Sequence, residues 1–341
     1  MGVRPLYRER KRMLAQTTYG RWLPPQLSEH GGKIDQLIDV LHVFMAVLFI
    51  AWGIFFVYCL FRFRAKQGHA ARYEPVKGLI SKYAEIGVGV FEAFLLLGLS
   101  MPVWADYKNK PPAESERLPV RVVAEQFQWN FHYAGKDGKF GSTDNSQITA
   151  SNPIGLRSDD PAGADDIVSV NEFHLPTGTP IYLRLTSKDV IHSFAIPTMR
   201  VKQDVIPGME IPIWFTAKEG SESEKLREQM VQHFPIEGAN WYKLRHMIAS
   251  EDHKSSGGEV LLAKGADLGD SFVKGKELIE SLQKAGVAEL VMQPRHPLEV
   301  ICAQLCGNSH FKMKATMVTH DAAGFNAWIE EKSKGVEFED F

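Results

Sequence analysis

The chain has few cysteines and no excess of charge of either sign. Only three of its 341 residues are cysteine (Cys59, Cys302 and Cys306), too few for a fold held together by disulfides. The 39 lysines and arginines nearly balance the 41 aspartates and glutamates, and the formal net charge of −2 argues against a nucleic-acid binder. No Cys-x-x-Cys-His motif occurs, which excludes a c-type haem attached to this chain.

Apolar residues gather in two runs near the N-terminus, although the mean hydropathy of the chain is only −0.18. Residues 40–61 carry no formal charge, and as a helix they would span about 33 Å, enough to cross a bilayer. The second run, residues 86–104, contains Glu92, and a lone acid in a span indicates packing against protein partners. We therefore expect an N-terminal extension (1–33) followed by a two-helix transmembrane hairpin (34–105).

Basic residues predict the orientation of this hairpin. The connector between the spans contains Arg62, Arg64, Lys66, Arg72, Lys77 and Lys82, whereas only Arg21 and Lys33 lie within about 20 residues before the first span. The positive-inside rule then places the connector in the cytoplasm and both termini on the periplasmic side of the plasma membrane. The basic stretch from Arg4 to Arg12 opposes this assignment but lies further from the span. Because no short apolar stretch with a cleavage site precedes residue 40, we expect an uncleaved anchor.

After a linker at 106–118, the hydrophobic period changes to two. The alternation predicts strands around 181–186, 211–215 and 313–317, separated by turn formers such as Pro207-Gly208. It also predicts one strand that carries Val123, Phe127, Trp129, Phe131 and Tyr133 on a single face. Several short strands with such turns indicate an all-β, antiparallel sandwich or barrel over residues 119–341.

Residues 221–297 interrupt this β pattern. Helical periodicity around 222–234 and 272–285 predicts an α-helical insertion, in which we expect His233, His246, His253 and His296 to be surface residues. The insertion precedes residues 302–313, so we expect both of its ends to lie near the rim of any site that this later loop forms. Phe325, Trp328 and Ile329 recur at helical spacing and predict a closing helix at 321–334.

Residues 302–313 hold the strongest chemical signal. Two cysteines, a histidine and a methionine (Cys302, Cys306, His310 and Met313) fall within 12 residues, directly before a predicted strand. Thiolate, thioether and imidazole ligands together favour copper, and a single blue-copper ion uses one cysteine with a distant histidine. His192, on an apolar strand face, is such a histidine. Two thiolates, two imidazoles and a thioether exceed the needs of one ion and suit two copper ions bridged by both sulfurs.

Other interpretations of these residues stay open at this point. The two cysteines could form a disulfide or, with one histidine, bind zinc. Met313 could be a core residue, and His192 a buried, hydrogen-bonded one. A mononuclear copper electron carrier would need only one cysteine. A membrane-tethered copper-binding assembly chaperone pairs Cys-x-x-x-Cys with a downstream histidine in a thioredoxin-like fold, whereas His192 lies upstream of the cysteines here.

In these residues the chain resembles subunit II of the haem-copper cytochrome c oxidases. Residues 302–313 match that family's Cys-x-Glu-x-Cys-x3-His-x2-Met motif at four of its five specified positions, and residues 189–194 and 202–208 resemble its histidine strand and the turn that follows. The resemblance implies a cupredoxin-like Greek-key fold with a dinuclear copper centre, CuA. The implied ligands are His192, Cys302, Cys306, His310, Met313 and the backbone carbonyl of Gln304.

The same resemblance implies a function for the chain. As one subunit of a proton-translocating oxidase, it would accept single electrons from a cytochrome c-type donor and pass them to haem in subunit I, which reduces O2 to water. No catalytic residue is then expected on this chain itself. Its other partners would be the remaining oxidase subunits and the lipid bilayer. A quinol-oxidase subunit II shares this architecture but lacks the metal loop.

Three positions qualify the resemblance. Gln304 replaces a glutamate that helps to hold magnesium in the family, so the resemblance implies copper but leaves a magnesium site in doubt. Phe127 replaces the family's electron-accepting tryptophan, and Trp129 matches its second tryptophan, so both are candidates for the point where electrons enter. This replacement and the insertion indicate a membrane-bound cytochrome or a partner respiratory complex as donor. Glu85 resembles a glutamate at the mouth of a proton path into subunit I, with an interfacial carboxylate as the alternative.

Overall fold

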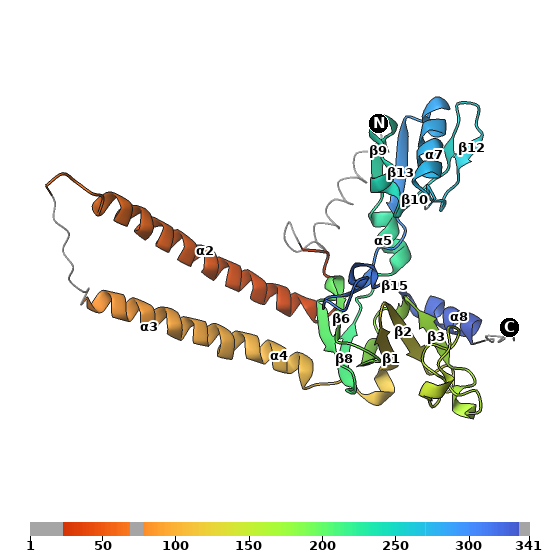
Figure 1. Cartoon of the computed structure of the whole chain (residues 1–341), viewed down its shortest axis with the longest axis horizontal. Helices are drawn as coiled ribbons and strands as arrows, with labels where there is room; N and C mark the ends of the chain where they lie inside the picture. The colour runs from red at the N-terminus through yellow and green to blue at the C-terminus, as the bar shows by residue number, and fades with distance from the viewer. Residues whose placement is uncertain (1–22, 69–77, 270, 334–341) are drawn as a thin grey trace. The chain divides into compact units, whose positions relative to one another are not determined.

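The computed structural model describes residues 23–68, 78–269 and 271–333, which form two compact units (Figure 1). One unit is helical and comprises residues 30–111. The other contains residues 23–29 together with the chain from residue 112 onward. The predicted basic stretch from Arg4 to Arg12, Arg21 and the connector residues Arg72 and Lys77 lie outside the described residues.

Two helical segments make up the first unit, and both are long and apolar enough to cross a membrane. The first is α2 (Gly31–Arg62). The second joins α3 (Leu79–Phe94), a π-helical turn (Leu95–Ser100) and α4 (Met101–Lys108). The predicted spans lie inside these segments. The helices continue into charged residues because backbone hydrogen bonding does not require apolar side chains.

The second unit is built on two five-stranded sheets. The first has the order β3-β2-β1-β5-β8, with β3 (Ile167–Val170), β2 (Gln128–Tyr133), β1 (Leu118–Glu125), β5 (Pro180–Ser187) and β8 (Ile211–Thr216). The second has the order β4-β15-β14-β6-β7, with β4 (Glu172–Pro176), β15 (Lys314–His320), β14 (Glu299–Cys302), β6 (His192–Ile196) and β7 (Val201–Val205). The β domain is confirmed, but each sheet contains one parallel pair, β1 with β5 and β4 with β15. Long crossovers bring these strands together, and local alternation does not report such pairings.

An aromatic core fills the β domain. Trp129, Phe131 and Tyr133 of β2 are almost completely buried, and Phe131 stacks on Phe173 of β4 at a centroid distance of 4.7 Å. The single strand predicted for residues 123–133 is wrong, because the chain turns at Gln126 and Phe127 and continues as the antiparallel strand β2. The two-residue turn shifts the alternation by one position, so that Val122 and Ala124, rather than Val123, share the core face with Trp129.

The segment that precedes the first helix also belongs to the β domain. Leu27 is 3% exposed and packs in the core, Ser28 forms a bridge with Ala217, and the N–H of Glu29 donates to the carbonyl of Thr216 at 3.0 Å. The chain therefore leaves this domain at Glu29 and returns to it at residue 112.

The insertion is a mixed α/β element rather than a helical one. It contains the predicted helices α5 (Ser223–Gln229) and α7 (Phe272–Lys284) and the short α6 (Trp241–Leu244). It also contains a sheet of β10 (Met247–Ala249), β13 (Glu289–Pro294) and β9 (Gln232–Pro235), and a hairpin of β11 (His253–Lys254) and β12 (Val260–Leu262). Pairing between strands far apart in sequence leaves no local period, so these strands escaped sequence analysis. Of the four histidines expected at the surface, His253 is buried and accepts a hydrogen bond from Val291.

The attachment of the insertion differs from our expectation. Its first residues contact the end of β15, where Ser223 Oγ accepts from the N–H of Thr319 at 2.9 Å. Its last residues lead into the start of β14, which ends at Cys302. Both ends therefore meet β14 and β15 at the side away from residues 303–313, because those residues connect the opposite ends of the two strands. The closing helix is confirmed as α8 (Ala322–Lys332), which packs Phe325 and Trp328 on the core.

We predict that Leu27→Ala lowers the free energy of unfolding of the β domain by about 2–5 kcal/mol, because the lost methyl groups leave a cavity in its core. Thermal or urea unfolding of the full chain measures this change. Leu23→Ala is the matched control, because the side chain of Leu23 is 38% exposed. We expect it to change the free energy of unfolding by less than about 0.5 kcal/mol. Equal destabilisation by both variants would contradict the core position of Leu27.

Candidate metal centre

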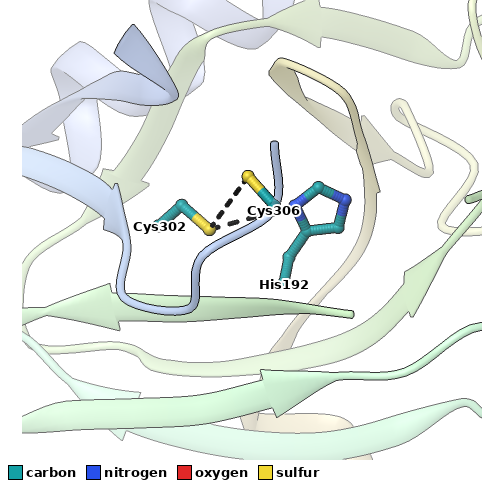
Figure 2. Close-up of side chains that lie close together, drawn as sticks. All are labelled: His192, Cys302 and Cys306. Atoms are coloured by element: carbon teal, nitrogen blue, oxygen red, sulfur yellow. Dashed lines mark hydrogen bonds between the residues drawn. The ribbon is translucent and has the colours of Figure 1, made fainter. Parts of the chain in front are cut away.

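Three parts of the second sheet bring the predicted ligands together (Figure 2). His192 begins β6, Cys302 ends β14, and Cys306 lies in the loop that leads to β15. Antiparallel pairing of β14 with β6 places Cys302 opposite Phe194, and the N–H of Ala303 donates to the carbonyl of Ser193 at 2.8 Å. These ladder contacts bring a histidine within reach of two cysteines that lie more than a hundred residues later.

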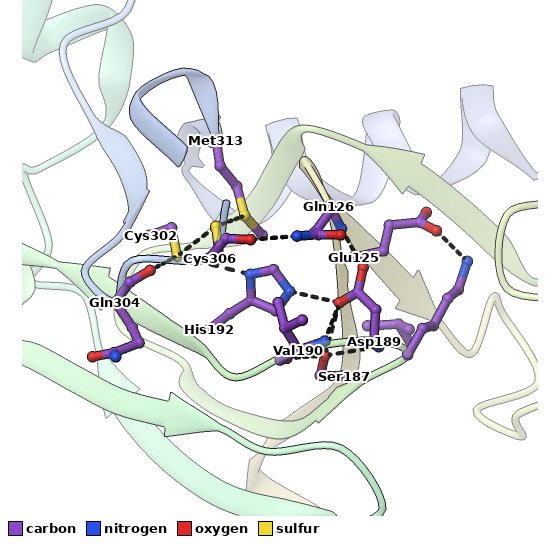
Figure 3. Close-up of polar contacts among 12 residues, drawn as sticks. Glu125, Gln126, Ser187, Asp189, Val190, His192, Cys302, Gln304, Cys306 and Met313 are labelled. Atoms are coloured by element: carbon purple, nitrogen blue, oxygen red, sulfur yellow. Dashed lines mark hydrogen bonds and ion pairs between the residues drawn. The ribbon is translucent and has the colours of Figure 1, made fainter. Parts of the chain in front are cut away.

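The sulfur atoms form the middle of the cluster, and each contacts its own histidine. Figure 3 shows the sulfurs with His192, Met313 and Gln304 around them. The two Sγ atoms are 3.9 Å apart. Cys302 Sγ lies 3.9 Å from His192 Nδ1 and 3.2 Å from the carbonyl oxygen of Gln304. Cys306 Sγ lies 3.5 Å from His310 Nδ1 and 3.7 Å from Met313 Sδ. All six predicted donors therefore lie in one chain of contacts.

This geometry fits metal ligation and does not fit a disulfide. A disulfide requires sulfurs about 2.0 Å apart, and both cysteines are free thiols. Two ligand atoms that each lie about 2.0–2.3 Å from the same metal ion are no more than about 4.6 Å apart. Every donor–donor contact described above meets that limit. His192, Cys302, Cys306 and Met313 are buried, so the donors are shielded from water. The site thus presents soft ligands for a soft metal such as copper.

The two thiols have pKa values shifted in opposite directions. Burial alone would raise the pKa of Cys302, but hydrogen bonds with His192 and the backbone outweigh it and lower the pKa. Burial and the neighbouring Cys302 thiolate raise the pKa of Cys306. The pair therefore holds one thiolate and one thiol near neutral pH, and a bound cation would displace the remaining proton.

A carboxylate that sequence analysis missed orients His192. The ring Nε2 of His192 donates to Asp189 Oδ1 at 2.8 Å, which leaves Nδ1 free to face the sulfurs. Asp189 also accepts from the N–H groups of Gln126 (2.7 Å) and Val190 (2.6 Å). Burial alone would raise the pKa of Asp189, but its hydrogen bonds with His192, Gln126 and Val190 outweigh burial and lower it. Gln126 in turn donates from Nε2 to the carbonyl of Cys306. The only sequence signal for Asp189 is its place three residues before His192.

The remaining predicted residues lie in different environments. Phe127 is half-buried at the edge of the metal loop, where a Cβ on Gly307 would come within 3.0 Å of its ring. Trp129 is fully buried, with its ring 6.1 Å from that of His192. The side chain of Gln304 is exposed and points away from the sulfurs, so its carbonyl alone faces the cluster (Figure 3). Glu85 is exposed on α3, in the helical unit.

Comparisons with known proteins point to one family. Residues 118–222 match the family model described as the periplasmic domain of cytochrome C oxidase subunit II. The chain is 27% identical over 312 residues to alternative cytochrome c oxidase subunit 2 of Bradyrhizobium diazoefficiens, covering 91% of this chain and 83% of that protein. It is 24% identical over 215 residues to cytochrome c oxidase subunit 2 of Cereibacter sphaeroides, covering 58% of this chain and 67% of that protein.

A solved structure is also similar. It is the periplasmic domain of subunit II of cytochrome oxidase from Bradyrhizobium japonicum. The match covers 66% of this chain and 96% of that one, with 18% sequence identity and a TM-score of 0.31.

We predict that Asp189→Asn weakens copper binding by about 10–100-fold, because the neutral amide no longer holds His192 with Nδ1 toward the sulfurs. Competition with a chelator, measured on the full chain, gives the affinity. Asp204→Asn is the matched control, because Asp204 accepts a hydrogen bond from Ser193 Oγ (2.8 Å), one residue after His192. We expect this variant to leave the copper affinity unchanged. Equal affinities for the two variants would contradict the orienting role.

Proposed function

The chain is a relative of cytochrome c oxidase subunit II and carries that family's periplasmic domain, and from this premise we propose that it is the subunit at which electrons enter a haem-copper oxidase. In this role His192, Cys302, Cys306, His310, Met313 and the Gln304 carbonyl hold two copper ions as a CuA centre. When bound, such a centre accepts and releases one electron at a time. The rest of the oxidase supplies the haem and the site that reduces O2.

One observation carries the proposal: two buried thiols 3.9 Å apart each have a histidine of their own. A mononuclear site would gather its ligands around one point, whereas here the imidazoles approach different sulfurs. The pattern favours two ions that share both thiolates. It also favours electron transfer over copper delivery, because a chaperone must release its metal and gains nothing from six enclosed donors.

The surroundings of the ligands suit rapid electron exchange. His192 is held by Asp189, and the loop is held at both ends, since the N–H of Cys302 donates to the carbonyl of Met313 at 3.1 Å. Side chains fixed in this way move little when the charge at the site changes by one. Burial of the donors also excludes water, whose reorientation would add to the barrier.

Exposed apolar residues beside the ligands support docking on subunit I. Leu305 (77% exposed) and Phe311 (71% exposed) lie within the metal loop, and Ile191 (47% exposed) directly precedes His192. Apolar side chains that stand free at a ligand loop mark a surface made for another protein. A haem-bearing subunit placed against them would receive the electron over a short distance.

On the donor side, we propose a cytochrome c-type protein that docks near Phe127. This ring is half-buried at the edge of the loop, whereas Trp129 is fully buried and lies further along the path, against His192. Phenylalanine lacks the indole N–H of the tryptophan that the family has here, so the donor surface differs. We therefore propose a membrane-bound cytochrome or a partner respiratory complex as the donor. The insertion would offer that partner a second contact surface.

The proposed location is the plasma membrane, with two spans and the β domain on the periplasmic side. The chain leaves the β domain before α2 and returns to it after α4, so its two crossings must begin and end on one side. Arg62, the last residue of α2, and Arg64 and Lys66 directly after it then lie in the cytoplasm. On α3, the exposed Glu85 is available to a neighbouring subunit as the mouth of a proton path. We do not propose a magnesium ion, because Gln304 offers no carboxylate.

We predict that the full chain, loaded with copper, binds two copper ions and shows the EPR signal of one unpaired electron shared between them. Cys302→Ser and Cys306→Ser abolish that signal, because neither bridging sulfur has a substitute. Cys59→Ser, in α2, is the control and leaves the signal unchanged. One copper per chain with a four-line spectrum would refute the dinuclear centre and favour a mononuclear carrier.

A second variant tests the role of Gln304. Because its carbonyl faces Cys302 Sγ and its amide is exposed, Gln304→Ala should leave the copper content and the visible spectrum nearly unchanged. His310→Ala serves as the positive control and removes copper or changes the spectrum strongly. Loss of copper from the Gln304 variant would show that the side chain itself contributes to the site.

A further inference from the structure

Three basic side chains form a row across the first sheet. In the strand register, His132 of β2 lies beside Arg121 of β1, and Arg121 lies beside Arg184 of β5. Residues in register point to the same face of a sheet, with about 4.8 Å between neighbouring strands. Since Val120 and Val122 on either side of Arg121 point into the core, this basic row lies on the opposite face.

The two ends of the basic row are neutralised. His132 Nε2 lies 2.6 Å from Asp166 Oδ2, and this pair is almost fully buried. At the other end, Arg184 Nη1 lies 3.7 Å from Glu210 Oε1. Each outer member of the row thus has one acidic partner.

The centre of the row has no such partner. Among the residues that the structure describes, Arg121 forms no ion pair; its guanidinium donates to the carbonyl of Gly141 at 3.3 Å and stacks on the ring of Phe140 at 4.3 Å. Burial and the neighbouring Arg184 lower the pKa of Arg121, while the more distant charges of Glu210 and Asp166 act against them. Like charges directly opposite each other destabilise a sheet, so the pair of arginines carries a cost that an anion between them would remove.

The basic row lines a cavity of about 920 Å³. Phe140, Ile148 and Ile154 supply apolar walls, and Ser142 and Thr186 are among its hydroxyl residues. Lys188 and the acidic residues Asp160 and Glu210 also line it, so cationic side chains outnumber carboxylates. The volume lies in the range of sites that take small organic ligands. None of the six proposed metal donors lines this cavity.

We propose that this cavity binds a phosphate group carried on an organic molecule, with Arg121 and Arg184 as its charged donors. Each guanidinium has five N–H donors, of which Arg121 uses one on Gly141. A phosphate carries up to two negative charges and three acceptor oxygens that point in different directions, so it suits two arginines on neighbouring strands better than a carboxylate, which has one charge and two oxygens in one plane. The apolar walls accommodate the organic part, which belongs either to a soluble phosphate ester or to a phospholipid headgroup.

Calorimetric titration of the full chain in neutral detergent with glycerol 3-phosphate tests the proposal, at constant ionic strength maintained with chloride. The wild type binds, and Arg121→Gln weakens binding by about tenfold or more, as expected for the loss of a charge-assisted hydrogen bond. Arg117→Gln is the matched control. Arg117 lies on the same face before β1, stacks on Tyr182 at 3.8 Å and is paired with Glu114, and its loss changes the affinity by less than about twofold.

Further measurements complete the test. Without ligand, Arg121→Gln melts near the wild-type temperature, because the loss of its contacts with Gly141 and Phe140 is offset by relief of the repulsion from Arg184. Arg184→Gln replaces it if it fails to fold. Micelles that contain phosphatidylglycerol compete with glycerol 3-phosphate if the natural ligand is a lipid headgroup, and do not if it is a soluble ester. No binding by the wild type, or equal weakening in the Arg121 and Arg117 variants, would overturn the proposal.

Discussion

The pairing of β6 with β14 is the constraint on which the metal centre depends. It holds the start of β6 beside the end of β14, so that His192 meets Cys302 although the insertion lies between them in sequence. The metal loop then needs to span only the short distance from β14 to β15, which pair with each other. Three neighbouring strands of one sheet therefore position all six donors, and the helices of the other unit contribute none of them.

The same sheet ties the centre to the core and to its surface. Trp129, which packs against Phe194 in the core, also contacts the ring of His192, so any shift of this ligand disturbs the aromatic packing. On the other side of His192, Asp189 accepts from the N–H of Gln126, and Gln126 reaches the loop through the carbonyl of Cys306. The candidate ligands are therefore restrained from both sheets, which suits the electron-transfer role that we propose for this site.

Sequence analysis could predict what depends on local spacing. The donors in residues 302–313 and the helices α2, α7 and α8 are visible as short motifs and periods, and His192 is visible as the histidine on an apolar strand face that such a copper site needs. Asp189, Gln126 and the strands of the insertion were missed, because each acts through partners that are distant in sequence. The basic row was missed for the same reason: Arg121 and Arg184 become neighbours only when the parallel register of β1 and β5 is known.

The segment before α2 has a consequence for how the protein is made. Ser28 is synthesised before its partners Met199 and Ala217, which follow about 170–190 residues later, so these contacts have a very long separation along the chain. During translation, both helices are therefore complete before this segment can find its place. Its docking is a late step, which links completion of the β domain to helices that have already been made.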